Sequence, residues 1–412
     1  MGALFNAPMH LSLLLGVLLA VSLSGPALAA GPSPGVAAVQ RGEFQQARKL
    51  LRAEAKAGVS GARYYLGVLL MEGTGGPPEP ARGMHWLTLA AAAGDAAAQY
   101  RVGIHKLRGE GIEANPTDAL RWFEAAARQG TIEAQFNLGF MHANGIGGPR
   151  ALERARLWYA EAAESGHPGA QHNLGLMYLN GEGVSRDASI AADWFERGST
   201  QQHAPSAYSL ARLLHTGDGI PLEEPRARKL FKAAARQDHR GAAYALAQMY
   251  RRGEGGEMDL DAAAKWYRKA ADAEHRGAQF QLGLMYARGR GIARDAGQVA
   301  FWHEKAARQG HIPAQVNLGA MYVNGYGVAQ NDTLAMAWWT LAAVSGDARA
   351  ARNLETLRHA MDGDAIAQAW TVSRELATDI PAIVAPGLSS AFTGPTLTVR
   401  KPFVASEQSQ GN

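Results

Sequence analysis

Cysteine is absent from the 412 residues of this chain. The protein therefore has no disulfide bonds, and it cannot carry a lipid attached through a cysteine. Aromatic residues are also few, at 8%, although the hydrophobic fraction reaches 47%. Alanine supplies much of that fraction, which is typical of closely packed helices. The stability of the protein must come from helix packing alone.

Strong charge of either sign is lacking too. The formal net charge is only +4, and the basic residues are spread along the whole chain. Nucleic-acid-binding proteins usually concentrate basic residues in one patch or along one helix. We therefore expect no nucleic acid among the partners.

Motifs for catalysis and metal binding are scarce. Pairs such as Gly109/Gly111 follow predicted helices and lack both a preceding strand and a Lys-Ser/Thr pair, so they do not indicate nucleotide loops. His303-Glu304 lacks the second histidine that a zinc site would need, and the other histidines are scattered. We expect no enzymatic activity, no metal and no cofactor.

What the chain does contain is a 36-residue unit that recurs without insertion or deletion from Gly58 to Ser345. Repeats of this length are typical of solenoids, in which each helix pair buries its apolar face against its neighbours. A tryptophan position is filled in every unit except the fifth, which has Leu230. A second position holds Leu66, Val102, Leu138, Leu174, Leu210, Leu246, Leu282 and Leu318.

Each unit predicts two helices. In residues 314–324, Ala314 and Leu318 fall on one helical face, and Gly325 follows as a residue suited to a left-handed helix end. The second helix is expected over residues 331–344, with Trp338 buried on one side. A small residue follows the repeated leucine, and we expect the tryptophan to fill the space that this small residue leaves between the two helices.

The motif A-x-x-x-L-G-x-x-Y-x-x-G-x-G, followed by W-Y/F-x-x-A-A-x-x-G, resembles the Sel-one-like repeat (SLR) family, which is related to the tetratricopeptide repeats. Residues 171–184 (QHNLGLMYLNGEGV) and 263–292 carry the motif most clearly. The resemblance covers eight units, residues 58–345. It implies an all-α fold, a right-handed α/α superhelical solenoid, that serves as a protein-binding scaffold, often in bacterial envelopes.

The segments outside the repeats have other predicted roles. Residues 1–29 predict a signal peptide cleaved near Ala29, because an apolar run from Leu11 to Leu23 precedes the small-residue pattern Ala27-Leu28-Ala29. The run lacks a preceding Lys or Arg, so an uncleaved N-terminal anchor is the alternative. The remaining segments are a linker (30–42), an N-terminal half-repeat cap (43–57), C-terminal capping helices (346–377) and a flexible tail (378–412).

The fourth and fifth units depart most from the pattern. Gly198-Ser199 replaces a pair of alanines, Ser206 replaces an alanine, and Leu230 replaces the tryptophan. This predicts either a bend in the superhelix or simple drift of a tolerant position.

One stripe on the first helices varies from unit to unit: it consists of the residue before the repeated leucine and the residues two and six positions after that leucine. We expect this stripe to line the concave face. Its asparagines suit hydrogen bonds to the backbone of an extended peptide, and its apolar residues suit contacts with the side chains of that peptide. Alternatively, the amides bridge adjacent helices, or Asn144, Asn180 and Asn324 cap helix ends. The candidate binding residues are Arg101, Ile104, Arg108, Asn137, Phe140, Asn173, Leu176, Gln281, Leu284, Arg288 and Asn317.

We therefore expect a monomeric, non-catalytic scaffold or adaptor of the cell envelope, periplasmic or secreted, that binds a protein or peptide in the concave groove. Membrane insertion is expected only for the N-terminal segment. The alternative is an envelope hydrolase acting on cell-wall-like substrates, which would need acids or a Ser/His pair facing the groove.

Overall fold

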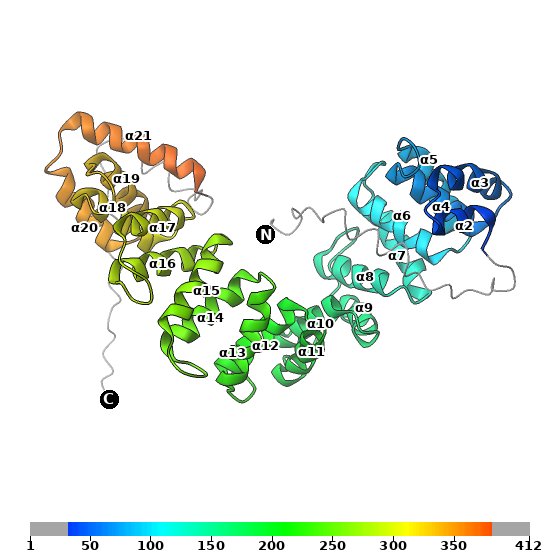
Figure 1. Ribbon diagram of the computed structural model, residues 1–412, viewed down its shortest axis with the longest axis horizontal. Helices are drawn as coiled ribbons and strands as arrows, with labels where there is room; N and C mark the ends of the chain where they lie inside the picture. Colours follow the sequence, from blue (N-terminus) through cyan, green and yellow to red (C-terminus); the bar gives the residue numbers. More distant parts are fainter. Residues whose placement is uncertain (1–31, 381–412) are drawn as a thin grey trace, which may run out of the picture. The chain divides into compact units, whose positions relative to one another are not determined.

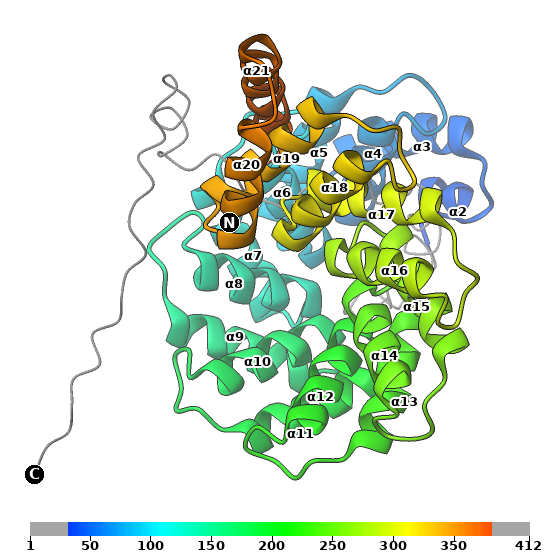
Figure 2. The same ribbon diagram turned by 90° about the vertical axis from the view of Figure 1, so that its left-hand side faces the viewer.

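The computed structural model of the protein describes residues 32–380, which form twenty helices and no strand. The chain divides into unit 1, up to His167, and unit 2, from Pro168. Within each unit the helices stack one after another in chain order (Figures 1 and 2). The expected all-α solenoid of helical repeats is confirmed. The predicted signal peptide lies outside the described residues.

Nearly all the helices have the same length of thirteen residues. Unit 1 contains α2 (Pro34–Gln40), α3 (Phe44–Lys56), α4 (Ser60–Glu72), α5 (Pro80–Ala92), α6 (Ala96–Arg108), α7 (Pro116–Arg128), α8 (Ile132–Asn144) and α9 (Leu152–Glu164). Unit 2 contains α10 (Pro168–Asn180), α11 (Ala188–Thr200), α12 (Ala204–Thr216), α13 (Glu224–Arg236), α14 (Arg240–Arg252), α15 (Leu260–Asp272), α16 (Arg276–Arg288), α17 (Ala296–Arg308), α18 (Ile312–Asn324), α19 (Asp332–Val344), α20 (Ala348–Arg358) and α21 (Gly363–Asp379).

Even-numbered helices from α4 to α18 are the first helices of the repeats, and odd-numbered helices from α5 to α19 are the second. Each first helix ends at the predicted glycine; Gly325 after α18 has a φ of 63°. The second glycine of the pair approaches the preceding repeat, since a Cβ at Gly327 would lie 2.0 Å from the carbonyl oxygen of Ala296 at the start of α17. The G-x-G sequence therefore ends a helix and joins two repeats.

The space between the two helices of a repeat is filled by the residue that follows the tryptophan. A Cβ at Gly103 would lie 2.7 Å from the ring of Phe123, and one at Gly175 would lie 2.6 Å from Phe195. The prediction that the tryptophan fills this space is wrong by one residue. Each residue turns the helix by about 100°, so the next side chain faces the glycine. The residues in this position, all buried, are Leu87, Phe123, Tyr159, Phe195, Phe231, Tyr267, His303 and Trp339.

The tryptophans instead join consecutive repeats. Trp122 packs against a buried cluster that includes Met84 and Leu87 of the preceding repeat. Trp122 is only half-buried, whereas Trp338 in the last repeat is 2% exposed, as the sequence predicts. The exposure of the side chain at the tryptophan position therefore depends on how much of that face of the second helix is covered.

Residues 34–40 form helix α2, although this segment was expected to belong to a linker. The Ser33 hydroxyl and the Gly35 N–H both donate to the carboxylate of Glu54 on α3, at 2.6 and 2.8 Å. Proline at the first helical position and a serine cap favour a helix start, and Val36 and Val39 are buried against α3 and α4. The Pro/Gly pattern was therefore wrongly interpreted as a linker, and the N-terminal cap begins earlier than residue 43.

Helix α21 packs along α19, as both views show (Figures 1 and 2). Ala369 and Ser373 on α21 are fully buried, as is Ile380 beyond its end. Thr340 and Leu341 of α19 are buried under this cover. The expected tail therefore begins later than residue 378, and its remaining part, 381–412, lies outside the described residues.

The irregular positions of the fourth and fifth repeats compensate each other. Ser206 is fully buried, and its hydroxyl lies 2.8 Å from Nδ1 of His203. A Cβ at Gly198 would lie 2.3 Å from that hydroxyl. Replacing one alanine by glycine thus makes room for replacing the other by serine.

Candidate binding surfaces

All eleven candidate stripe residues lie on first helices. Unit 1 contributes five from α6 and α8, and unit 2 contributes six from α10, α16 and α18. Arg108 and Arg288 are exposed, and the other nine are half-buried. The stripe is thus a partly accessible face within each unit.

Three amides of the stripe donate hydrogen bonds to the helices themselves. Asn137 donates to the hydroxyl of Tyr100 on the neighbouring first helix, at 3.5 Å. Asn144 and Asn324 donate to the carbonyl oxygens of Phe140 and Ala320 one turn earlier, at 2.8 and 2.7 Å. These contacts match the bridging and capping alternatives, so the amides contribute less free hydrogen-bonding capacity than their number suggests.

In unit 1 the arginines of the stripe are paired with carboxylates. Arg101 lies 3.1 Å from Glu72 on the preceding first helix, and Arg108 lies 3.5 Å from Glu110 in the loop that follows it. The positive charge of this part of the stripe is therefore largely neutralised by the chain.

In unit 2 two arginines of the stripe have no acidic partner. Arg212 on α12 and Arg288 on α16 are both exposed, and neither forms an ion pair within residues 32–380. Arg252 on α14 pairs with Glu254 at 3.2 Å, but its side chain remains 51% exposed. Arg212 and Arg252 were not among the candidate residues, although both occupy positions of the same stripe.

A depression of about 410 Å³ opens on this stripe between α10 and α12. Leu176 and Leu179 of α10 face Arg212 and Thr216 of α12 across it. An ion pair between Arg186 and Asp218, at 2.6 Å, lies in its wall. Leu176, which was predicted as a binding residue, lines this depression.

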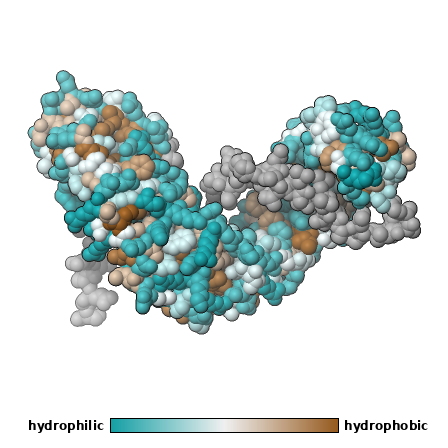
Figure 3. Space-filling view, in the orientation of Figure 1, coloured by the Kyte–Doolittle hydropathy of each residue, from teal (hydrophilic) through white to brown (hydrophobic). Residues whose placement is uncertain are grey.

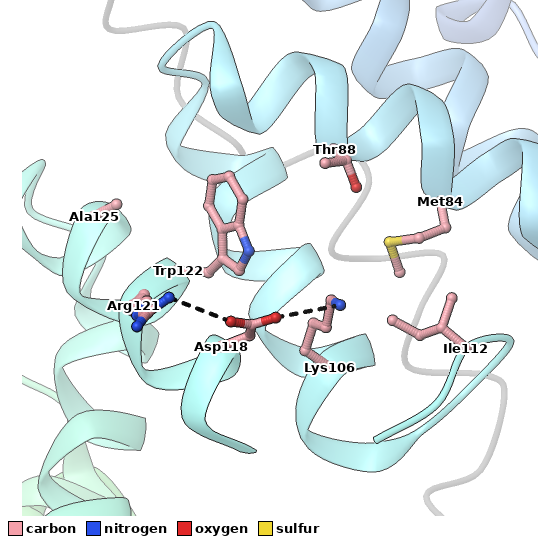
Figure 4. Close-up of a pocket in the computed structure, with 8 residues that line it drawn as sticks. All are labelled: Met84, Thr88, Lys106, Ile112, Asp118, Arg121, Trp122 and Ala125. Atoms are coloured by element: carbon pink, nitrogen blue, oxygen red, sulfur yellow. Dashed lines mark ion pairs between the residues drawn. The ribbon is translucent and has the colours of Figure 1, made fainter. Parts of the chain in front are cut away.

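A second depression, of about 490 Å³, lies in unit 1 on the side of the second helices (Figure 4). Trp122 forms one wall, opposite Met84 and Ile112. Asp118 lies between two cations, 3.5 Å from Lys106 and 3.7 Å from Arg121, so its charge is already balanced (Figure 4). The sequence analysis missed this site because it assigned the tryptophans to the core.

The histidines between repeats act as helix caps. Nδ1 of His239, His275 and His311 accepts the backbone N–H three residues later, at 3.0 to 3.3 Å. Their rings also lie against an aromatic ring of the preceding first helix, as His275 does on Tyr244 with centroids 4.3 Å apart. Burial lowers the pKa of all three imidazoles, which favours the neutral form that can accept a hydrogen bond. These histidines therefore cap the first helices and pack on the preceding repeat.

Side chains suited to catalysis do not gather in the described part of the chain. Within residues 32–380, no three His, Asp or Glu side chains are grouped closely enough to hold a metal ion. Gly31 to Gly35 spells G-x-S-x-G, which is also the pattern of a nucleophile elbow, but Ser33 caps α2 and donates to Glu54. In the same residues no helix is long and apolar enough to span a bilayer.

The exposed surface has few large apolar areas. On the face seen in Figure 3, small hydrophobic patches interrupt a mainly hydrophilic surface. The exposed large hydrophobic residues include Leu157 and Phe301, each on the outer side of a second helix. Scattered apolar residues of this kind are normal for a protein surface and identify no binding site alone.

The chain is similar to solved structures of helical repeat proteins, and the first of the following two supports this architecture. A Sel1 repeat protein from Oxalobacter formigenes is 28% identical, with a TM-score of 0.62, over 83% of this chain and 99% of its own. A protective antigen present in uropathogenic Escherichia coli strains, displaying an SLR fold, is 25% identical over 92% of this chain and 97% of its own, with a TM-score of 0.48. Among curated proteins, none matches the sequence significantly.

The Sel1 repeat itself is found eight times in succession. The matched residues are 60–95, 96–131, 132–167, 168–203, 204–239, 241–275, 277–311 and 312–347. They agree with the predicted repeats to within about two residues, span the helix pairs from α4 to α19 and cover most of the chain. The chain belongs to the Sel1 repeat family.

Proposed function

We propose that this protein is a non-catalytic scaffold of the cell envelope that binds a protein or peptide through the face of its first helices. Sel1 and related helical repeats generally mediate protein–protein interaction, and this chain has the same repeats. The observation that carries the proposal is the contrast within each first helix. Leu138 and Leu282 hold a constant buried position, while the neighbouring stripe positions change from Asn137 to Gln281 and from Phe140 to Leu284.

A face of this kind suits recognition rather than chemistry. The stripe offers amides, arginines and apolar side chains on rigid helices, and these groups select a partner by hydrogen bonding, charge and shape. The hydrolase alternative receives no support from the comparisons, and no residue of the stripe is a carboxylic acid except Glu72, which pairs with Arg101.

The proposed location is the periplasm or the cell exterior. Its support is the apolar run from Leu11 to Leu23 followed by Ala27-Leu28-Ala29. Fractionation of cells expressing the full chain, with mass determination of the mature N-terminus, tests this. A product that begins near Ala30 in the periplasmic fraction supports export, and a full-length cytoplasmic product refutes it. Sedimentation of the same product tests the proposed monomer.

The binding function is tested by crosslinking followed by identification of the captured proteins. The full chain is compared with a variant carrying Leu176→Asp and Leu284→Asp, two half-buried changes on the first-helix face of unit 2. The matched control carries Leu157→Asp and Phe301→Asp, two exposed changes on second helices. A partner retained by the control and lost by the first variant supports the proposal. A partner lost only by the control places binding on the second helices.

A further inference from the structure

We propose that the stripe of unit 2 binds an acidic segment of the partner protein. The segment would lie across α12, α14 and α16, with its carboxylates paired to Arg212, Arg252 and Arg288. This inference rests on the proposed function, because it states which kind of polypeptide the first-helix face recognises.

The three arginines lie on corresponding sides of their helices. Arg212 follows the repeated leucine of its helix by two residues, and Arg252 and Arg288 follow theirs by six. Positions four residues apart on a helix lie on one face, so these two repeat positions share the stripe. Three consecutive first helices therefore each contribute one guanidinium to the same face.

The charge of two of these three arginines is not balanced by the chain. The stripe of unit 2 contains no Asp or Glu in any of its five repeats. Arg212 and Arg288 are exposed and have no carboxylate partner within residues 32–380. Of the nearby acids, Asp218 is paired with Arg186 at 2.6 Å. Glu254 lies 3.8 Å from His215 and 3.2 Å from Arg252, whose side chain remains 51% exposed.

Unit 1 shows that the same repeat positions can be neutralised. Arg108 occupies the position of Arg288 but lies 3.5 Å from Glu110, and Arg101 lies 3.1 Å from Glu72. The residue of unit 2 that corresponds to Glu110 in the repeat of Arg288 is Arg290. At this loop position the repeat of Arg288 therefore has a positive charge, whereas the repeats of Arg108 and Arg252 have the carboxylates of Glu110 and Glu254.

Apolar contacts accompany the charges. The depression between α10 and α12 is bounded by Leu176 and Leu179 on one side and by Arg212 on the other, and Leu284 is half-buried one turn before Arg288. An apolar side chain of the segment fits against these leucines while its acids meet the arginines. This mixture favours an acidic polypeptide over a nucleic acid, whose phosphates would need a denser run of cations.

The spacing of the helices predicts the spacing of the acids. Packed helices lie about 8–10 Å apart, and an extended chain rises about 3.3 Å per residue. An acidic residue at about every third position of the segment would therefore reach successive arginines. Charge-assisted bonds between guanidinium and carboxylate groups are among the stronger hydrogen bonds in proteins.

The test uses fluorescence anisotropy with the full chain and labelled peptides of about twelve residues, a length that crosses the three helices at the extended rise. One peptide carries Asp at every third position with leucines between. A second replaces each Asp by Asn, and a third by Lys. We expect the acidic peptide to bind at least about tenfold more tightly than the amide peptide, and its affinity to fall as salt rises. Equal binding of the acidic and amide peptides would overturn the proposal.

The variant Arg212→Gln with Arg288→Gln should lower the affinity for the acidic peptide about tenfold while leaving the melting curve unchanged. The matched control is Arg82→Gln with Arg128→Gln, which removes two exposed arginines from second helices of unit 1. The control should bind within about twofold of the wild type. An equal loss in both variants would refute the assignment to unit 2.

Other anionic partners are outcomes of the same assay. A single-stranded oligonucleotide, or vesicles of phosphatidylcholine with phosphatidylglycerol, that bound more tightly than the acidic peptide would overturn the proposal. Crosslinking separates this failure from failure of the proposed function. A partner captured equally by the wild type and by Arg212→Gln with Arg288→Gln keeps the scaffold function and removes the acidic segment.

Discussion

Arg108 in unit 1 and Arg288 in unit 2 occupy the same position in their repeats, but only Arg108 has a carboxylate beside it. The surrounding framework is the same, since Val102 on the helix of Arg108 and Leu282 on the helix of Arg288 hold the same repeat position and are both fully buried. These two repeats therefore differ in charge on a shared scaffold. The repeat positions explain the fold of both units, and only the stripe distinguishes what each can bind.

A second difference lies at the joints between repeats. In unit 2, His239, His275 and His311 cap first helices with a neutral imidazole, whereas Asp95 caps α6 in unit 1 with a carboxylate. Protonation of these imidazoles removes the lone pair that accepts the backbone N–H, and burial lowers the pKa at which this happens below the ordinary histidine value. Unit 2 therefore loses three helix caps when these imidazoles are protonated.

The largest effect is expected from Ala369→Asp, which places a charge in the fully buried contact between α21 and α19. Burying an unpaired charge should cost about 3 kcal/mol or more of unfolding free energy. Amide hydrogen exchange should rise in α19 and α21 and stay unchanged in unit 1. The control Thr371→Asp adds the same charge at an exposed position of α21. Faster exchange in unit 1 would show that the two units do not respond independently.

The shared framework predicts equal effects of Gly103→Ala in unit 1 and Gly175→Ala in unit 2. Each new methyl group would lie within 2.7 Å of a buried phenylalanine ring, and overpacking of this kind should cost about 2 kcal/mol. Gly61→Ala makes the same change in α4 where nothing lies within 4 Å, and should stabilise by up to about 1 kcal/mol. Urea denaturation measures all three. If one of the two substitutions left the unfolding free energy unchanged, the frameworks of the two units would differ.

The third prediction concerns His303 of unit 2, which occupies the position of Phe123 in unit 1. His303 is 2% exposed, its ring lies 5.3 Å from that of Phe280, and burial lowers its pKa from the ordinary 6.5 to about 4. Its neutral form is favoured by folding, so its contribution to stability is complete above pH 6.5 and is lost as the pH falls from 6.5 towards 4.

His303→Phe should therefore stabilise the protein at pH 5 by about 2 kcal/mol more than at pH 7, since each pKa unit corresponds to about 1.36 kcal/mol. Chemical denaturation at the two pH values measures the difference. Phe195→Leu changes a buried residue at the same repeat position without removing a titratable group, and as the control it should show no such difference. An unchanged pH dependence in His303→Phe would contradict the burial argument.

The smallest effect is expected at the compensated pair of unit 2. Gly198→Ala alone would place a methyl group 2.3 Å from the Ser206 hydroxyl, whereas Gly198→Ala with Ser206→Ala restores the alanine pair found in other repeats. We expect a coupling free energy of about 1 kcal/mol between the two changes, measured by a double-mutant cycle. Additive effects would mean that the two substitutions arose without compensating each other.

Sequence reasoning recovered the parts of the fold that depend on local pattern. The helices around Leu318 and Trp338 begin and end within about two residues of their predicted bounds, because glycines and caps mark the helix ends. Pro34 was misread because proline both breaks helices and begins them, and only burial against α3 decides between the two. The tryptophan was assigned to the wrong contact because adjacent positions on a helix both look apolar.

The candidate site was only partly predictable. The stripe could be located from the period, and its residues do lie on first helices. Whether an arginine is free depends on loop residues such as Glu110 and on neighbouring helices such as the one carrying Glu72, and these contacts do not follow from the repeat. The packing of α21 on α19 could have been predicted from the sequence. Thr340 and Leu341 occupy positions that hold the charged residues Glu304 and Lys305 in the preceding repeat, so the sequence indicates that this part of α19 is covered.

Hydrogen exchange of the full chain with and without the acidic peptide tests the contrast between the two units most directly. We predict slower exchange at the C-terminal ends of α12, α14 and α16, where Arg212, Arg252 and Arg288 lie, and unchanged exchange in α4, α6 and α8. Protection confined to the first helices of unit 1, or to second helices of either unit, would contradict the assignment of binding to the exposed arginines of unit 2.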